Sequence, residues 1–291
     1  MNVLSLFDGI SCGRVALEKA GIKVDKYYAS EIDKHAIKIS EKNYPDIIHI
    51  GDVTLVNGKD YEGVDLLIGG SPCQSLSITQ SKTRQHLDGK SKLFYEFVRI
   101  FEESKPKHFI FENVASMTKE SKAVITSLLG VEPVYINSNS FVPQHRARLY
   151  WTNLPVDVSG LSESNTCLLD IMENNVPEKY FYNVGYDFHG WDKNVCATVH
   201  VSGHDILKRV FNPNTKSHTL TTASGGNTQK KVFDGFRPRK LTPTEYERLQ
   251  GLPDGYTEGV ADTYRYGMLG NGWTVDVISF ILRFIPREFT E

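Results

Sequence analysis

The chain has 291 residues, which is long enough for one large domain and a smaller second one. With 40% hydrophobic residues, 23% charged residues and a formal net charge of −2, its composition is that of a soluble globular protein. The sequence contains neither an apolar run of about eighteen residues nor a Cys-x-x-Cys pair, so we expect no membrane span, no metal, no disulfide framework and a location in the reducing cytoplasm.

The first predicted elements form a nucleoside site. A strand at Val3–Phe7 leads into a glycine turn and a helix, and a second strand, Val24–Ile32, ends at Glu31. Glycines let the backbone approach a ligand at a helix amino terminus, and a carboxylate accepts hydrogen bonds from two ribose hydroxyls. The spacing of Gly9 and Gly13 differs from G-x-G-x-x-G and disfavours a dinucleotide. Glycines that serve only packing would give the same pattern.

A third predicted strand, Ile47–Ile50, precedes Gly51-Asp52-Val53. An aspartate just beyond a strand can accept a hydrogen bond from an adenine amino group, while the valine packs on the ring. An ordinary turn aspartate fits the same residues equally well. The sequence leaves both interpretations open.

The apolar run Val64–Ile68 is typical of a buried strand in a parallel sheet. It ends in two glycines, Ser71, Pro72 and Cys73, at the position where open α/β sheets place their chemistry. A buried structural thiol is the alternative, because free cysteine is among the most buried residue types. A core cysteine does not need a Gly-Gly-Ser-Pro platform, so we favour a nucleophile.

A polar segment with five basic side chains, 79–92, is predicted to be a loop over the site, and a helix at 93–103 follows it. The next strand, 107–114, carries Glu112 near its carboxyl end. A neighbouring parallel strand would bring this carboxyl beside the Cys73 thiol, where it could donate or share a proton. A strand-end or capping acid is the alternative.

Gln144-His145-Arg146-Ala147-Arg148 opens a further predicted strand. Side chains at i and i+2 of a strand point the same way, so Arg146 and Arg148 are expected to act as paired donors to a phosphate or carbonyl oxygen. For either arginine alone, a surface salt bridge would be favoured.

After Pro155 the pattern becomes short and rich in Asn, Gly, Ser and Thr, which indicates a small β-rich domain or insertion. Residues 206–240 hold eight Lys or Arg and one Asp, which favours a surface facing a polyanion. A helical pattern returns after Arg239, with Thr242 as the predicted cap before Pro243.

In this order the segments resemble the DNA cytosine-5 methyltransferase family of bacteria and phages, and the catalytic half is most similar to the animal de novo DNA methyltransferases. The resemblance covers the whole chain except about 156–236. One departure is Ser11-Cys12 where many bacterial members have glycine, and another is Ser91-Lys92 in place of an Arg-Gly pair. The matching stretches are Val3-Leu4-Ser5-Leu6-Phe7-Asp8-Gly9-Ile10, Ala29-Ser30-Glu31, Gly51-Asp52-Val53, Gly70-Ser71-Pro72-Cys73, Leu93-Phe94, Phe111-Glu112-Asn113-Val114, His145-Arg146-Ala147-Arg148 and Gly270-Asn271.

The resemblance implies an α/β, Rossmann-like mixed sheet of the S-adenosylmethionine-dependent methyltransferase class, with a smaller target-recognition domain. The catalytic, cofactor-binding domain would span 1–155 and 239–291, and the recognition domain 156–238. S-adenosyl-L-methionine would be the cofactor and S-adenosyl-L-homocysteine its product. The residues that this implies for the cofactor are Phe7, Asp8, Gly9, Gly13, Glu31, Ile32, Asp52, Val53, Ser71, Pro72, Asn271, Trp273, Thr274 and Val275.

The resemblance also implies that a cytosine flips out of duplex DNA and that Cys73 adds to its C6. Glu112 would hold N3 and the amino group, and Arg148, with Arg146 beside it, would bind O2. The residues expected to contact DNA are Gln74, Lys82, Arg84, Lys230, Lys231 and Arg237.

Partners and alternatives follow from the same resemblance. A nucleoid-associated prokaryotic or phage enzyme is expected, either within a restriction-modification system, with a cognate endonuclease, or as an orphan. The alternatives are an RNA cytosine-5 methyltransferase and a catalytically idle DNA-binding protein. The transfer-RNA branch carries a Cys-Phe-Thr motif that this sequence lacks, and the intact Cys73, Glu112 and Arg148 disfavour an idle protein.

Overall fold

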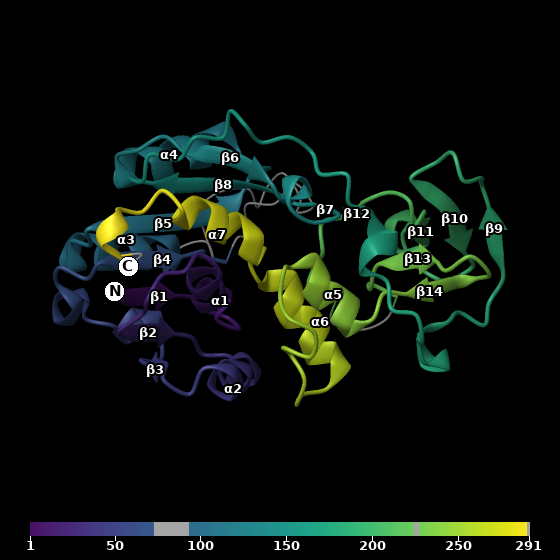
Figure 1. The fold of residues 1–291 in the computed structure, drawn as a ribbon, viewed down its shortest axis with the longest axis horizontal. Coiled ribbons are helices and arrows are strands. Elements are labelled where there is room, and N and C mark those ends of the chain that lie inside the picture. Colours follow the sequence, from purple (N-terminus) through teal and green to yellow (C-terminus); the bar gives the residue numbers. More distant parts are fainter. Residues whose placement is uncertain (73–92, 224–226, 290–291) are drawn as a thin grey trace. The chain divides into compact units, whose positions relative to one another are not determined.

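The computed structural model describes residues 1–72, 93–223 and 227–289. The chain forms two compact units, and each is described by itself (Figure 1). Unit 1 consists of residues 1–137, 147–160 and 277–291, and unit 2 consists of residues 138–146 and 161–276.

Unit 1 is built on a seven-stranded sheet with the order β3-β2-β1-β4-β5-β8-β6. Its first five strands run parallel, while β8 is antiparallel to both β5 and β6. This mixed α/β sheet confirms the predicted fold class. The strands are β1 Asn2–Leu6, β2 Lys26–Ser30, β3 Ile48–His49, β4 Leu66–Gly69, β5 His108–Val114, β6 Val134–Asn137 and β8 Ala147–Thr152. The helices are α1 Cys12–Lys19, α2 Lys34–Asn43, α3 Leu93–Ser104, α4 Lys119–Leu129 and α7 Val275–Leu282, of which Val275 and Asp276 belong to unit 2.

An aromatic cluster forms the centre of the unit 1 core. Phe97 of α3 lies 4.7 Å from Phe111 of β5 between ring centroids, and Trp151 of β8 lies 5.9 Å from Phe111. A Cβ on Gly69 would approach the Phe97 ring to 3.0 Å, so the end of β4 has room for little more than a glycine. The apolar face of α3 therefore packs tightly over the strand that leads toward Cys73.

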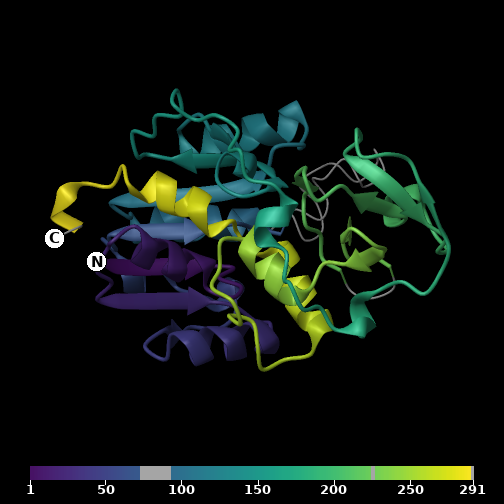
Figure 2. The same ribbon diagram turned by 45° about the vertical axis from the view of Figure 1, so that its right-hand side comes forward.

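Both ends of the described chain lie at the same end of the unit 1 sheet (Figures 1 and 2). The Asn2 N–H donates to the Asp65 carboxylate at 2.7 Å, and Lys107 pairs with the same carboxylate. Near the carboxyl terminus, the Phe289 ring meets the His108 ring edge-on at 6.1 Å. These contacts close the amino-terminal edge of the sheet, opposite the strand ends that carry the predicted site.

Unit 2 contains a five-stranded sheet with the order β14-β13-β11-β10-β9 and a two-stranded sheet of β12 and β7. The larger sheet has a small core formed by Cys196, Ala197, Val199, Val210 and Phe233. The strands are β7 Gln144–His145, β9 Tyr186–Phe188, β10 Val195–Val199, β11 Arg209–Phe211, β12 Ser217–His218, β13 Lys231–Phe233 and β14 Pro238–Lys240, and the helices are α5 Pro243–Leu249 and α6 Asp262–Asn271.

The two units do not divide where the sequence suggested. The predicted boundary near 155 lies close to the observed one at 160, but the stretch 239–276 belongs to unit 2 and not to unit 1. The reason is that β14 joins the unit 2 sheet and α5 follows it directly, with Thr242 as the predicted cap. The functional division into catalytic and recognition domains stays a prediction.

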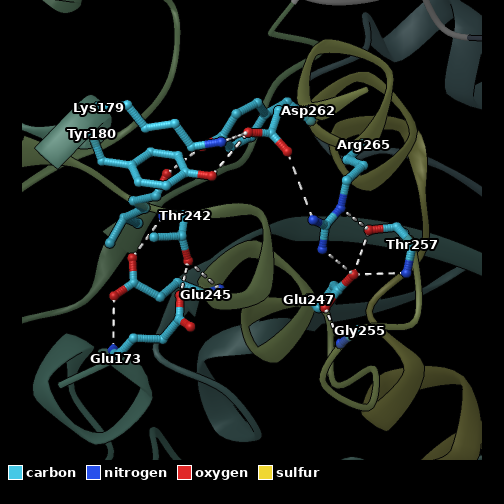
Figure 3. A network of polar contacts seen from close by, with 12 residues as sticks. Glu173, Lys179, Tyr180, Thr242, Glu245, Glu247, Gly255, Thr257, Asp262 and Arg265 are labelled. Atoms are coloured by element: carbon cyan, nitrogen blue, oxygen red, sulfur yellow. Dashed lines mark hydrogen bonds and ion pairs between the residues drawn. The ribbon is translucent and has the colours of Figure 1, made fainter. Parts of the chain in front are cut away.

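Two buried carboxylates organise α5 (Figure 3). Glu245 accepts both guanidinium donors of Arg239, at 2.6 and 2.8 Å, together with the Thr242 and Glu173 backbone N–H groups. Two residues on, Glu247 pairs with Arg265 of α6 at 3.0 Å. An unpaired charge in the protein interior is very unfavourable. Each buried carboxylate therefore stabilises the helix only while its arginine is present.

Removal of the buried arginine tests this arrangement. The Arg239 and Glu245 side chains are 1% and 0% exposed, so Arg239→Met leaves a buried charge unpaired and should lower the free energy of unfolding by about 3–5 kcal/mol in a urea titration. Arg237→Met is the matched control, because its ion pair with Glu178 is exposed and should contribute less than about 1 kcal/mol. Equal losses in both variants would contradict the assignment.

Candidate active site

The turn after β1 has an uncommon backbone. Phe7 and Ser11 have φ values of 59° and 60°, and Gly9 has 60°. L side chains rarely adopt this left-handed region, and such conformations concentrate at functional sites. The Gly9 N–H donates to the Glu31 carboxylate at 2.8 Å, which joins this turn to the end of β2.

Glu31 is held in place by backbone amides. Besides Gly9, its carboxylate accepts from the Ile32 and Asp33 N–H groups at 2.8 and 2.9 Å. The Ile32 side chain is 72% exposed although it is large and apolar. A fixed acid beside an uncovered apolar side chain can receive a ligand that has hydroxyls and a flat apolar ring.

Asp8 stabilises the turn itself. Its carboxylate accepts from the Ser5 and Ser11 hydroxyls, both at 2.5 Å, and from Tyr27 at 2.7 Å. Burial raises the pKa of Asp8 above its ordinary value, against the lowering effect of the three hydroxyl donors. Asp8 therefore has a structural role in holding the strained turn, and its predicted contact with the cofactor would come in addition to that role.

Asp52 and Val53 follow β3. The Asp52 carboxylate accepts from both the N–H and the hydroxyl of Thr54 at 2.9 Å and caps a short 3₁₀ helix, Val53–Leu55. The Val53 side chain is buried in the unit 1 core. The turn-aspartate interpretation therefore describes the observed contacts, and the adenine contact stays a prediction.

The predicted nucleophile follows β4. Ser71 is buried and its hydroxyl accepts from the Asn113 side chain at 3.5 Å, while Pro72 is the last residue described before the gap. Cys73, Gln74, Lys82 and Arg84, all predicted site residues, lie outside the described residues.

The acid and one arginine of the predicted catalytic set lie together. Glu112 on β5 is 9% exposed, and the Arg148 Nε on β8 lies 2.6 Å from its Oε1. The β4–β5 register pairs Gly69 with Phe111, so Glu112 stands one position beyond the end of β4, at the edge from which the chain continues to Cys73. This site offers an acceptor and a cation within one hydrogen bond of each other.

Arg146 does not join this pair, and the expectation of two arginines pointing the same way is wrong. Arg146 precedes β8 and does not lie within it, so strand alternation does not apply. Its guanidinium donates to the carbonyl oxygens of Leu220, Gly270 and Gly272 at 2.9–3.1 Å, all within unit 2. Arg146 thus fixes the backbone of unit 2, and its catalytic role stays a prediction.

The predicted cofactor residues near the carboxyl terminus form a turn in unit 2. Asn271 is the last residue of α6, and the Thr274 hydroxyl and the Val275 N–H both donate to Gln250, each at 2.9 Å. Gln250 in turn donates to the Gly272 carbonyl at 3.0 Å. Sequence reasoning missed Gln250 and the anchoring role of Arg146, because both act on carbonyls far away in the chain.

Several basic side chains of the run 206–240 bind carbonyl and carboxylate groups of the protein itself. Lys231, predicted to contact DNA, is 1% exposed and donates to the Asn227 and Gln229 carbonyls at 2.7 and 3.0 Å. Arg237, predicted likewise, pairs with Glu178 at 2.5 Å. Lysine and arginine satisfy buried carbonyls and carboxylates here, so the run is not the continuous cationic surface that its composition indicated.

Burial also neutralises two of these lysines in part. Desolvation, followed by the nearby cations Lys240 and Lys230, lowers the pKa of Lys231 from 10.5 to about 7. Desolvation, followed by Arg209, lowers the pKa of Lys230 to about 8. A phosphate-binding role for Lys231, as the sequence suggested, does not agree with this burial, whereas Lys230 is only half-buried and its predicted contact with DNA stays a prediction.

A polar cavity of about 550 Å³ in unit 2 was not predicted from the sequence. One wall is held by Lys216, which is buried and donates to the Ser164 and Thr166 carbonyls, both at 2.6 Å. Asn165, Asn194 and Asn214 are among the lining residues, and asparagine side chains can supply both donors and acceptors. The cavity can therefore receive a polar group.

The described residues contain neither a cluster of metal ligands nor a helix that could span a membrane. In residues 1–72, 93–223 and 227–289, no group of three or more His, Cys, Asp or Glu is arranged to hold a metal ion. No helix in these same ranges has the length and apolar character needed to cross a membrane.

The chain matches known proteins along almost its whole length. A family model described as C-5 cytosine-specific DNA methylase matches residues 1–287. The type II methyltransferase M1.ScrFI of Lactococcus lactis subsp. cremoris is 30% identical over 96% of this chain and 76% of its own length. The orphan methyltransferase M.SPRI of Bacillus phage SPR is 31% identical over 87% of this chain and 68% of its own.

Solved structures share the fold. The Entamoeba histolytica methyltransferase EhMeth superimposes with a TM-score of 0.76 at 19% identity, covering 100% of this chain and 99% of that one. The Dnmt2 methyltransferase of S. pombe gives a TM-score of 0.70 at 19% identity, covering 97% of each.

The buried lysines predict how stability depends on pH. Because the pKa of Lys231 falls from 10.5 to about 7 on folding, the unfolded chain binds more protons between these values, and the free energy of unfolding rises with pH. The melting temperature should therefore rise from about pH 7 to about pH 8.5. Lys231→Met should lose most of this rise, and the exposed Lys193→Met should keep it. A flat wild-type profile would place the Lys231 amine in water.

Proposed function

This chain belongs to the C-5 cytosine-specific DNA methylase family, and we propose that it transfers a methyl group from S-adenosylmethionine to C5 of a cytosine in double-stranded DNA. The structural observation that supports this assignment is the Glu112–Arg148 pair, at the sheet edge where Ser71 and Pro72 lead to Cys73. Carboxylate, cation and thiol are the groups that methylation of C5 requires.

The chemistry explains why all three are needed. C5 of cytosine is a poor nucleophile until a thiolate adds to C6, so the first step forms a bond from the Cys73 sulfur to C6. The electrons of the C5–C6 double bond move toward N3, which takes a proton from Glu112, and C5 becomes the carbon of an enamine. That carbon would take the methyl group from the sulfonium of S-adenosylmethionine, whose S–CH3 bond breaks and leaves S-adenosylhomocysteine. A base such as water would then remove the C5 proton, so that the C5–C6 double bond is restored and the Cys73 thiolate is expelled, while N3 returns its proton to Glu112.

Glu112 and Arg148 fit these roles by position. Glu112 would hold N3 and the amino group, while Arg148 would donate to O2 from the adjacent strand. Their contact at 2.6 Å keeps the carboxylate and the guanidinium oriented before a base arrives. A preorganised pair needs little rearrangement as charge develops on the ring.

The cofactor would lie over the ends of β1, β2 and β3. S-adenosylmethionine supplies an electrophilic methyl group there. The Glu31 carboxylate, held by three backbone amides, suits ribose hydroxyls, and the uncovered Ile32 side chain suits the adenine ring. Gly9 lets the turn after β1 approach the ligand closely.

Sequence-specific recognition is proposed for unit 2. Relatives of this chain are named as type II methyltransferases and as an orphan phage methyltransferase, so this enzyme would act either with a cognate endonuclease or alone. The asparagine-lined cavity supplies amide groups, which can pair with base edges. The recognised sequence would be read by bisulfite sequencing of a bacterial host that expresses the chain.

A covalent trap tests the assignment of Cys73. A target cytosine with fluorine at C5 cannot lose that substituent as a cation, so the reaction should stop with protein and base joined. Duplex DNA carrying fluorocytosine should give a denaturation-resistant adduct on a gel, and only when S-adenosylmethionine is present. Cys73→Ser should abolish the adduct, because an alcohol is far less ionised than a thiol at neutral pH.

Cys167→Ser is the matched control, since Cys167 is a free cysteine that lies in unit 2. It should form the adduct as the wild type does. If the wild type methylates a DNA on which it forms no adduct, the route through Cys73 is refuted. Methylation of RNA in place of DNA would support the alternative substrate, and DNA binding without methylation would indicate an idle protein.

Glu112→Gln tests the proton donor. The amide keeps the shape of the side chain but cannot give N3 its proton, so turnover should fall by about 10²-fold or more. Steady-state methylation with tritiated cofactor measures this, and cofactor binding should be unchanged. Near-normal turnover would remove Glu112 from the catalytic residues.

A further inference from the structure

The segment from Gly51 to Gly58 carries the predicted adenine-binding residues and has no strand partner of its own. It begins where the Ser30 hydroxyl donates to the Gly51 carbonyl at 2.8 Å. Only short-range backbone bonds follow, such as the Leu55 N–H to the Asp52 carbonyl at 3.0 Å. A loop of this kind takes its conformation from contacts made by other elements.

Arg99 of α3 supplies those contacts. Its guanidinium donates from Nη2 to the Val53 carbonyl at 3.2 Å and from Nη1 to the Val56 carbonyl at 2.9 Å. The same side chain pairs with Glu96 and Glu103, both at 2.9 Å and both on α3. The two carboxylates orient the guanidinium, so contacts within α3 hold it in place in addition to its hydrogen bonds to the loop.

Glu103 adds a second anchor at the end of the loop. Its carboxylate accepts from the Gly58 N–H at 2.8 Å as well as from Arg99. A Cβ on Gly58 would lie 2.7 Å from the Glu103 Cβ, so this close approach requires glycine. The face of α3 formed by Arg99 and Glu103 thus binds three backbone groups of one loop.

We propose that Arg99 is a positioning residue for the cofactor: through Val53 and Val56 it sets the conformation of the 51–58 loop and thereby the affinity for S-adenosylmethionine. The inference rests on the proposed function, because it takes the cofactor and its loop from there. Arg99 touches neither cofactor nor base; it acts through the backbone that bears Asp52 and Val53. In the chain, α3 also follows directly after the segment that contains Cys73.

Hydrophobic packing, which does not involve Arg99, also holds the loop in place. The Val53 and Val56 side chains are both buried in the unit 1 core. Loss of the guanidinium should therefore loosen the backbone without unfolding the unit. Cofactor affinity should fall more than stability, which distinguishes a positioning role from a purely structural one.

Calorimetric titration with S-adenosylhomocysteine tests the proposal. Arg99→Met removes two charge-assisted hydrogen bonds, and the dissociation constant should rise about tenfold or more. Arg99→Lys keeps one donor of the same charge and should recover part of the affinity. In turnover assays KM for the cofactor should rise while kcat at saturating cofactor stays within about twofold of wild type.

Lys105→Met is the matched control. Lys105 lies two residues beyond Glu103, and its ion pair with Glu62 is exposed to solvent, so the substitution removes only an exposed cation. It should bind like the wild type, and DNA affinity without cofactor should be unchanged in all variants. Unchanged cofactor affinity in Arg99→Met overturns the inference, as does an equal loss of cofactor and DNA binding. If Arg99→Met does not fold, Arg99→Lys carries the same test. A wild type that binds no cofactor refutes the proposed function instead.

Discussion

The alignment of parallel strands is the constraint on which the predicted site of unit 1 depends. β2, β1, β4 and β5 pair in register, so their carboxyl ends reach one edge of the sheet. Glu31, Ser71 and Glu112 follow or end three of these strands and are thereby brought to the same edge although they are far apart in sequence. Open α/β sheets bind ligands there because each strand end delivers a side chain and each following turn delivers backbone.

Cations that bind carbonyl oxygens are the second organising principle. Arg99 holds Val53 and Val56, Arg146 holds three carbonyls of unit 2, and Lys231 holds two. Each satisfies acceptors that loops leave unpaired, and two of the three, Arg146 and Lys231, are buried. A count of basic residues in a segment therefore overstates the charge that is available to a nucleic acid.

This distribution bears on how the methyltransferase would hold its substrate. In 206–240 the arginines at 209, 237 and 239 are paired with acids. These pairs reduce the positive charge that the run offers to a DNA backbone, and we propose that unit 2 also contributes polar groups such as those around its cavity. If chemistry takes place on the sheet of unit 1 and recognition on unit 2, as we propose, relatives of one family can differ in the DNA sequence that they read.

How much could be predicted from the sequence depended on the range of the interaction. Features that depend on neighbouring residues in the chain were predicted correctly. These are the strands, the glycine turn at Gly9 and the start of α5 at its cap, Thr242. The family, too, could be read from local motifs, and the match over 1–287 confirms it.

What only the tertiary structure decided are contacts between distant segments. No local signal in the sequence shows whether Arg146 binds a substrate or carbonyl oxygens 74 to 126 residues away. Likewise, none shows whether Lys231 faces DNA or the interior. The same holds for Gln250, and for the stretch from 239 to 276, which belongs to unit 2 because β14 joins the sheet of that unit. The sequence determines which chemical groups a side chain carries, but the tertiary structure determines which partner it binds. The physical reason is that a buried donor or acceptor must form a hydrogen bond with a group that the fold places beside it.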